Sequence, residues 1–298
     1  MTARSLAAAL LGAAVTVPLP AAQTAFRSGV DFVIVDVSVR LGGEPVTDLS
    51  TADFQLHDGG IEQTLDEVSR ETLPIDVLFV IDLSGSVEGP LLESLTRAVG
   101  AVQDRLRPTD RISVVTFNHR IREIDAVSVG ALAAPLRLGV PMGQTSLIDA
   151  MVVGLIRAPE AGRRRMAIVF TDGLDTTSFL DGATLLEVAR RAETAVFTVA
   201  LTYGTTQPEP RPPHQPLLES LAELTGGTFA VLQHNQDLGD LGASFVQAFD
   251  EFRTSYVLSY AYQGPARDGW HPLSVRVRRP SPRGTYEVRA RQGYFAAP

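Results

Sequence analysis

Apolar and polar residues alternate near both ends of the chain and gather into longer runs between them. From Val33 to Arg40, a valine at every second position alternates with mostly polar side chains, which is typical of a strand buried on one face. Turns are predicted at Gly42-Gly43 and at Asp58-Gly59-Gly60. We therefore expect residues 28–72 to form a small β unit that is too short to bury a core by itself.

Between residues 74 and 250, apolar runs alternate with segments of helical spacing. The predicted buried strands are 75–82, 111–117, 166–170, 196–201 and 228–232, with 121–127 as an antiparallel partner of the second. Helices are predicted over 91–106, 147–156, 185–195, 217–224 and 238–252, and a proline-rich surface loop over 205–216. This alternation predicts an α/β fold with a doubly wound, mostly parallel sheet covered by helices on both faces.

The last part of the chain, residues 253–298, returns to short alternating segments at 254–262, 273–278 and 284–291. Pairing of these strands with residues 28–72 would bury both sets of apolar faces in one small β-sandwich. We therefore expect the α/β domain to be inserted in, or flanked by, that sandwich. Trp270 and the tyrosines of the last strands are interpreted as sandwich core or edge packing.

The first residues have the pattern of a secretory signal. Arg4 precedes an apolar run from Leu6 to Val17, and small residues follow up to Ala22. The run is too short for a membrane-spanning helix, so we expect export to the periplasm or beyond and no stable span after removal of residues 1–22. An N-terminal segment that is retained as an anchor is the alternative.

Composition excludes several kinds of function. The net charge of the 298 residues is -8, which argues against nucleic acid as a partner. The chain has no cysteine, so disulfides, thiolate catalysis and zinc-thiolate sites are excluded. Its five histidines show no paired ligand spacing, so zinc hydrolysis has little support.

Candidate metal ligands lie where strands or loops end. Asp82, Ser84 and Ser86 follow the first buried strand, Asp172 ends another, and Thr145 lies on a glycine-containing loop before a helix. Ligand sites of open α/β sheets lie at the carboxyl ends of strands, and Mg²⁺, Mn²⁺ and Ca²⁺ prefer such oxygen ligands. Taken alone, Asp82 to Ser86 also fits a simple helix cap, because Asp and Ser are good N-caps.

The five positions together resemble the metal-ion-dependent adhesion site of von Willebrand factor A domains, over residues 74–250. The flanks, with Tyr256–Tyr260 and Arg289–Tyr294, resemble a bacterial subfamily called VWFA-related that is abundant in acidobacterial genomes. The resemblance implies that Ser84, Ser86 and Thr145 ligate the metal directly, and that Asp82 and Asp172 ligate it directly or through water.

Three other acidic or basic features have structural interpretations. For Asp149 we favour a place in the first turn of its helix over a role in orienting Thr145, and for Asp175 an exposed turn. Arg163-Arg164-Arg165 is interpreted as a solvated strand entry in preference to a partner patch.

These observations predict an exported, non-enzymatic binding module of the adhesion type. A divalent ion, Mg²⁺ or alternatively Mn²⁺ or Ca²⁺, would bind a carboxylate supplied by a partner protein. The alternatives are a scaffold component of an envelope assembly, in which the metal only stabilises the fold, and a metal-dependent hydrolase.

Overall fold

The computed structural model describes residues 32–70, 73–128, 138–157, 160–202, 214–233, 239–265 and 268–296. The predicted signal segment, 1–22, and most of the predicted proline-rich loop lie outside these residues. Within them, none of the helices has the length and apolar character needed to cross a membrane.

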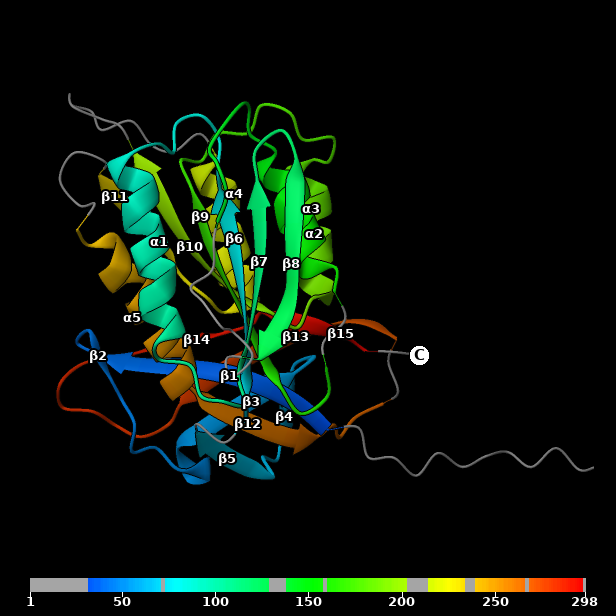
Figure 1. Cartoon of the computed structure of the whole chain (residues 1–298). Helices are drawn as coiled ribbons and strands as arrows, with labels where there is room; N and C mark the ends of the chain where they lie inside the picture. Colours follow the sequence, from blue (N-terminus) through cyan, green and yellow to red (C-terminus); the bar gives the residue numbers. More distant parts are fainter. Residues whose placement is uncertain are drawn as a thin grey trace, which may run out of the picture. The chain divides into compact units, whose positions relative to one another are not determined.

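A six-stranded sheet forms the centre of the α/β region, in the order β11-β10-β9-β6-β7-β8 (Figure 1). All neighbours are parallel except β7 and β8, which form the predicted antiparallel pair. The bounds are β6 Ile75–Asp82, β7 Arg111–Phe117, β8 Ile121–Ser128, β9 Arg164–Thr171, β10 Ala195–Thr202 and β11 Phe229–Gln233. β6, β9 and β10 are buried along nearly their whole length because helices cover both faces of the sheet.

Five helices cover this sheet and confirm the predicted doubly wound arrangement (Figure 1). α1 (Pro90–Gln103) and α5 (Leu241–Thr254) pack on one face, around a core that includes Phe79, Phe170 and Phe245. The other face is covered by α2 (Leu147–Leu155), α3 (Gly182–Arg191) and α4 (Gln215–Thr225). Each face therefore has its own apolar cluster.

Two antiparallel sheets are made jointly by strands from before and after the α/β region, as the sequence predicts. One has the order β14-β1-β12-β5, with β2 beside β1, and the other has the order β15-β13-β3-β4. A separate apolar core with Val37, Leu56 and Leu258 fills the space between them. The bounds are β1 Phe32–Leu41, β2 Glu44–Pro45, β3 Phe54–Asp58, β4 Ile61–Gln63, β5 Glu67–Arg70, β12 Tyr256–Ala261, β13 Gly269–Val277, β14 Tyr286–Ala290 and β15 Gly293–Ala296.

Several predicted elements have different bounds in the structure. α3 begins at Gly182 instead of 185, because the Asp181 side chain accepts a hydrogen bond from the Thr184 N–H (2.8 Å) and caps the helix. α4 begins at Gln215 and includes Pro216, which the sequence placed in the loop; proline is tolerated in a first helical turn, where its missing N–H needs no partner. Residues 46–56 hold a short 3₁₀ turn, Thr51–Asp53, before β3.

Of the two places predicted for Trp270, the sandwich core was wrong, and edge packing agrees with the structure. Its ring packs against the apolar cluster beneath α2, α3 and α4. The centroid of the ring also lies 5.6 Å from that of Phe295, which belongs to the edge strand β15 that the sequence did not predict. This strand and β13 carry aromatic side chains to the α/β region, which an alternating pattern alone does not reveal.

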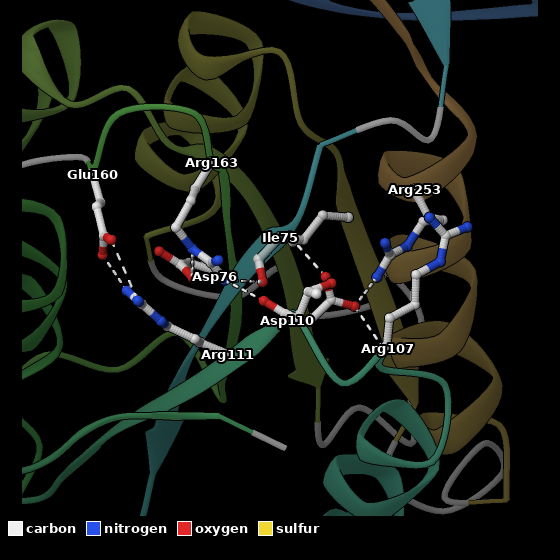
Figure 2. Close-up of polar contacts among 9 residues, drawn as sticks. Ile75, Asp76, Arg107, Asp110, Arg111, Glu160, Arg163 and Arg253 are labelled. Atoms are coloured by element: carbon white, nitrogen blue, oxygen red, sulfur yellow. Dashed lines mark hydrogen bonds and ion pairs between the residues drawn. The ribbon is translucent and has the colours of Figure 1, made fainter. Parts of the chain in front are cut away.

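The interpretation of Arg163-Arg164-Arg165 as a solvated entry was also wrong. Arg163 pairs with Asp76, and the Arg164 side chain is 1% exposed and pairs with Asp36 of β1 (2.6 Å). Figure 2 shows Arg163 and Asp76 beside a second pair, in which buried Asp110 accepts hydrogen bonds from Arg253, the Ile75 N–H and the Arg107 N–H. These arginines join the amino-terminal edge of the sheet to α5 and β1.

Candidate metal centre

The candidate ligands meet at the carboxyl-terminal edge of the six-stranded sheet. Asp82 is the last residue of β6, and Asp172 follows directly after β9, its parallel neighbour. Both strands end at the same level because Ile81 is in register with Phe170. Their two carboxylates are 0% and 5% exposed.

Four of the five predicted residues are connected by hydrogen bonds. Asp82 Oδ1 accepts the Ser84 N–H at 2.8 Å, which turns the loop back towards the strand end. The hydroxyl oxygens of Ser84 and Ser86 are 3.0 Å apart, and Ser86 Oγ donates to Asp172 Oδ2 at 2.8 Å. The sequence prediction that these side chains share one site is therefore supported by their positions.

Thr145 reaches the same place through its loop. The Gly143 carbonyl, two residues earlier, accepts the Gly85 N–H at 3.1 Å, in the middle of the serine loop. Gly143 has φ +74°, and a Cβ there would lie 2.3 Å from His119 Nδ1, so only glycine fits this turn. Thr145 itself is 4% exposed.

A third loop, residues 172–181, holds Thr145 and the start of α2 in place. Thr176 Oγ1 accepts the Thr145 N–H at 3.0 Å, and the Thr145 carbonyl accepts from the backbone N–H groups of Thr176 and Thr177. Hydrogen bonds of the backbone and of the Thr176 hydroxyl therefore connect the three loops.

The carboxylates of Asp149 and Asp175 both hold this loop against α2 through hydrogen bonds. The interpretations from sequence described neither contact. Asp149 lies in the first turn of α2, as favoured, but its carboxylate accepts the N–H groups of Phe179 and Leu180. Asp175 is half-buried and accepts the Ile148 N–H at 3.0 Å, so it caps α2 from another loop. The exposed-turn interpretation of Asp175 was wrong, because only the folded chain brings it to the helix.

Burial raises the pKa of Asp82 to about 6, and the negative charge of Asp172 adds to this effect. Hydrogen bonds from Ser84 and Thr171 act in the opposite direction. None of the ion pairs in the described segments includes Asp82 or Asp172. Two buried carboxylates without a cationic side chain form an environment that favours a bound cation.

The oxygen atoms suit a small divalent ion. Adjacent ligands of an octahedral Mg²⁺ site, each 2.0–2.1 Å from the metal, are about 2.9 Å apart. The oxygen atoms along Ser84, Ser86 and Asp172 are 2.8 Å and 3.0 Å apart, which are hydrogen-bond distances that also allow the atoms to bind one ion as neighbouring ligands. Across the described residues, no group of three or more His, Cys, Asp or Glu side chains is arranged for a metal, so hydroxyls would have to complete this donor set.

Thr171 is a residue of the site that the sequence reading missed. It is fully buried, its Oγ1 donates to Asp82 Oδ2 at 3.2 Å, and the same oxygen accepts the Gly173 N–H. It orients one carboxylate and shapes the loop that carries the other. A hydroxyl immediately before Asp172 at a strand end was the signal available in the sequence.

Comparison with known families gives one match that covers more than half of the chain. The model of the von Willebrand factor type A domain matches residues 76–241. This range contains all five candidate ligands and ends at the first residue of α5.

Among curated proteins, similarity is limited to part of each relative. An uncharacterized protein of Synechocystis sp. is 33% identical over 107 residues, which is 34% of this chain and 26% of that protein. The inter-alpha-trypsin inhibitor heavy chain H2 of Sus scrofa is 37% identical over 70 residues, 24% of this chain and 8% of the relative. The matched part thus spans about a quarter or less of these proteins.

Among solved structures, a von Willebrand factor type A protein from Catenulispora acidiphila is similar over 89% of this chain and 73% of that chain. The sequence identity is 12% and the TM-score is 0.48.

Proposed function

The chain belongs to the von Willebrand factor type A domain family, and on this basis we propose that it is a metal-dependent protein-binding module. Asp82, Ser84, Ser86, Thr145 and Asp172 would hold one divalent ion, Mg²⁺ in the first place and Mn²⁺ or Ca²⁺ as alternatives. The ion would supply the positive charge that recognises a carboxylate of a partner protein. One observation carries this proposal: Asp82 and Asp172 are buried side by side, and neither forms an ion pair in the described residues.

The choice of ligand for the ion follows from coordination number. The donor set contains five residues, two with carboxylates and three with neutral hydroxyls, which is one short of the six ligands of an octahedral ion. A sixth position would be open to a further oxygen, and Ser86, between Ser84 and Asp172 in the hydrogen-bonded series, is exposed. An acidic side chain is the group that a protein partner offers.

Apolar side chains around the site also support a binding role. Phe179 is 98% exposed, and Val140, Met142 and Leu174 are 77%, 52% and 43% exposed. Asp149 holds the backbone of Phe179, so this ring is presented on a braced loop and loses little freedom on binding. Exposed aromatic side chains on fixed backbone are typical centres of protein interfaces.

We further propose that the role is adhesion or assembly outside the cytoplasm, as the pattern of residues 1–22 predicts. The hydrogen bonds of Asp82, Ser84 and Asp172 involve backbone N–H groups and hydroxyls, which suits a site that holds an ion. We therefore propose binding, with hydrolysis as the alternative that the turnover assay below tests.

Calorimetric titration of the chelator-treated protein with Mg²⁺ tests the metal site. We expect saturable heat and a rise in Tm, both lost in Asp172→Asn, which keeps the shape of the side chain. Glu88→Gln is the matched control, because Glu88 is an exposed carboxylate beside the same loop. If the unsubstituted protein shows no heat and no change in Tm, the proposal is contradicted.

Recognition of a partner carboxylate is tested with immobilised peptides that carry Asp next to an aromatic residue. We expect binding in Mg²⁺, loss of binding in chelator, and loss when the peptide Asp is replaced by Asn. Binding that is equal for the Asp and Asn peptides would refute the carboxylate role. Turnover of a generic ester or phosphoester, dependent on Asp82 and Asp172, would instead favour a hydrolase.

A further inference from the structure

A cavity of about 370 Å³ lies at the opposite edge of the six-stranded sheet, between the start of β9 and strand β1. Its lining includes Arg164, Arg165, Thr194, Phe197, Phe252 and Arg291. The volume falls in the range of about 300–1,000 Å³ that is usual for small-molecule sites. The site is built from both parts of the fold, since Arg291 follows β14 and Arg164 begins β9.

Two residues of the lining each have a buried polar atom that lacks a hydrogen-bond partner among the described residues. One is Nη1 of Arg164, whose other nitrogens donate to Asp36, the Phe252 carbonyl and Ser255 Oγ at 2.6–2.7 Å. The other is the hydroxyl of Thr194, which is 4% exposed. Unsatisfied buried donors are rare in folded proteins and indicate an absent acceptor.

Arg165, which is buried, and Arg291, which is half-buried, have no carboxylate partner in the described segments. Arg165 donates to the Arg157 carbonyl, and Arg291 donates to the carbonyls of Gly293 (2.7 Å) and Ala192 (3.4 Å). Burial lowers the pKa of both guanidinium groups. A carbonyl satisfies one N–H but does not neutralise the charge, so positive charge remains in the cavity wall.

Acidic residues near the cavity do not cancel this charge. Asp36 is paired with Arg164, and Glu251 is paired with Arg40 and Arg289. Glu193 lies at the exposed side of the lining and acts on Arg165 and Arg291 without forming an ion pair in the described residues. Glu160, the fourth acidic residue of the lining, is paired with Arg111, and Arg163 with Asp76. The charges left without an ion pair in the described residues are then those of Arg165, Arg291 and Glu193, which leaves a positive balance.

We propose that this cavity is a binding site for a phosphate group, either free phosphate or a small phosphate ester. Guanidinium groups from β9 and from the segment after β14, with the Thr194 hydroxyl, supply donors from several directions, as a tetrahedral oxyanion requires. Apolar residues such as Phe197 and Phe252 line the remaining volume, which exceeds that of phosphate alone. The site is separate from the candidate metal centre and does not depend on it.

The test is thermal unfolding of the full chain with chelator present, so that no metal contributes. Inorganic phosphate or glycerol 3-phosphate, at ten times its Kd, is expected to raise the Tm by about 3 °C relative to chloride at equal ionic strength. Stabilisation by both compounds supports a free-phosphate site, and stabilisation by the ester alone supports an ester site. An equal effect of chloride, or no effect of either compound, overturns the proposal.

Substitutions in the cavity wall test whether the phosphate-dependent rise in Tm arises at this cavity. Arg165→Gln and Arg291→Gln should each abolish the phosphate-dependent shift, whereas Arg283→Gln, at an exposed arginine, should preserve it. Thr194→Val should weaken phosphate binding without lowering the Tm in chloride, because it removes a hydroxyl that has no partner. Glu193→Gln should tighten binding by removing a like charge. A shift that is unchanged in Arg165→Gln and Arg291→Gln, together with no heat on titration of the unsubstituted protein with phosphate, refutes the site.

Discussion

The two edges of the six-stranded sheet differ in whether their buried carboxylates are paired with a cationic side chain. At the carboxyl edge, Asp82 and Asp172 are buried together, and their hydrogen-bond partners are hydroxyls and backbone N–H groups. At the amino edge, Asp110 and Asp76 are each paired with an arginine, as Figure 2 shows. The first edge lacks compensating charge, whereas the second contributes pairs that join α5 and β1 to the sheet.

This difference separates binding from stability. A carboxylate with an internal cation has its charge balanced and contributes to the fold, whereas carboxylates without one hold charge that an external ion can neutralise. Changes to the paired charges of the amino edge should therefore act on the free energy of unfolding, and changes to the carboxylates of the carboxyl edge should act mainly on metal and partner binding. The predictions below test that division.

The largest effect on stability is expected for Asp110→Ala. The substitution leaves the Arg253 guanidinium buried without its counter-charge and removes the acceptor of the Ile75 and Arg107 N–H groups. We expect a loss of about 3–5 kcal/mol in the free energy of unfolding, measured by urea denaturation. Asp250→Ala, which breaks an exposed pair with Arg105, should cost less than about 1 kcal/mol, and equal costs would contradict the comparison.

Asp82→Asn should instead increase the free energy of unfolding of the metal-free protein at neutral pH. The pKa of Asp82 is about 6 in the folded chain and 3.8 ordinarily, so its protonated form favours folding. This contribution is fully present below about pH 4 and is lost as the pH rises through about 6, with a total of up to about 3 kcal/mol.

Urea denaturation in chelator at pH 5 and pH 7.5 measures this contribution. The unsubstituted protein should lose stability relative to Asp82→Asn as the pH rises, because the variant carries no charge at this position. The variant should also lose the stabilisation by Mg²⁺. A difference between the two proteins that does not change with pH would argue against an uncompensated charge at this edge.

Asp175→Ala should have a smaller effect on stability and a clear effect on metal binding. It leaves the N–H groups of Ile148 and Ser178 without their acceptor, at a cost of about 1–2 kcal/mol. The loop that fixes Thr145 loses a brace, so the calorimetric affinity for Mg²⁺ should fall. The matched control is Asp181→Ala, which removes the cap of α3 and should reduce stability without changing metal affinity.

Phe179→Ser should change the free energy of unfolding least, by no more than about 0.5 kcal/mol, because the ring is 98% exposed. The same substitution should weaken Mg²⁺-dependent binding of the acidic peptides and leave the Mg²⁺ titration unchanged. Reduced stability with unchanged peptide binding would show that this ring belongs to the fold and not to the binding surface.

Sequence patterns located the strands well where the pattern is local, and the candidate ligands that they indicated lie close together in the structure. β6 has the predicted bounds because an apolar run, interrupted only by Asp76 near its start, ends at Asp82. The serine loop and Asp172 follow from the rule that ligand sites lie at strand ends, and the structure brings them within hydrogen-bonding distance. The start of α3 was missed because its cap, Asp181, precedes the apolar positions that signal the helix.

Residues whose partners are distant in the sequence were read incorrectly. Asp175 was taken as an exposed turn, but its acceptor role depends on the start of α2, 27 residues away. Arg164 was taken as solvated, but its partner Asp36 is 128 residues away. The sequence around a charged residue looks the same whether its side chain is solvated by water or paired with a residue that is distant in the sequence.

The sequence by itself determined the order of strands and helices, the parallel sheet and the identity of the candidate ligands, because hydrophobic periodicity and strand-end residues are local properties. Only the tertiary structure decided which charges are balanced internally. That balance arises from contacts between segments such as β9 and β1, which the chain brings together only on folding. It leaves the carboxylates of one sheet edge without an internal cation, where we propose a metal site, and makes the other edge an arginine-rich junction with a cavity of its own.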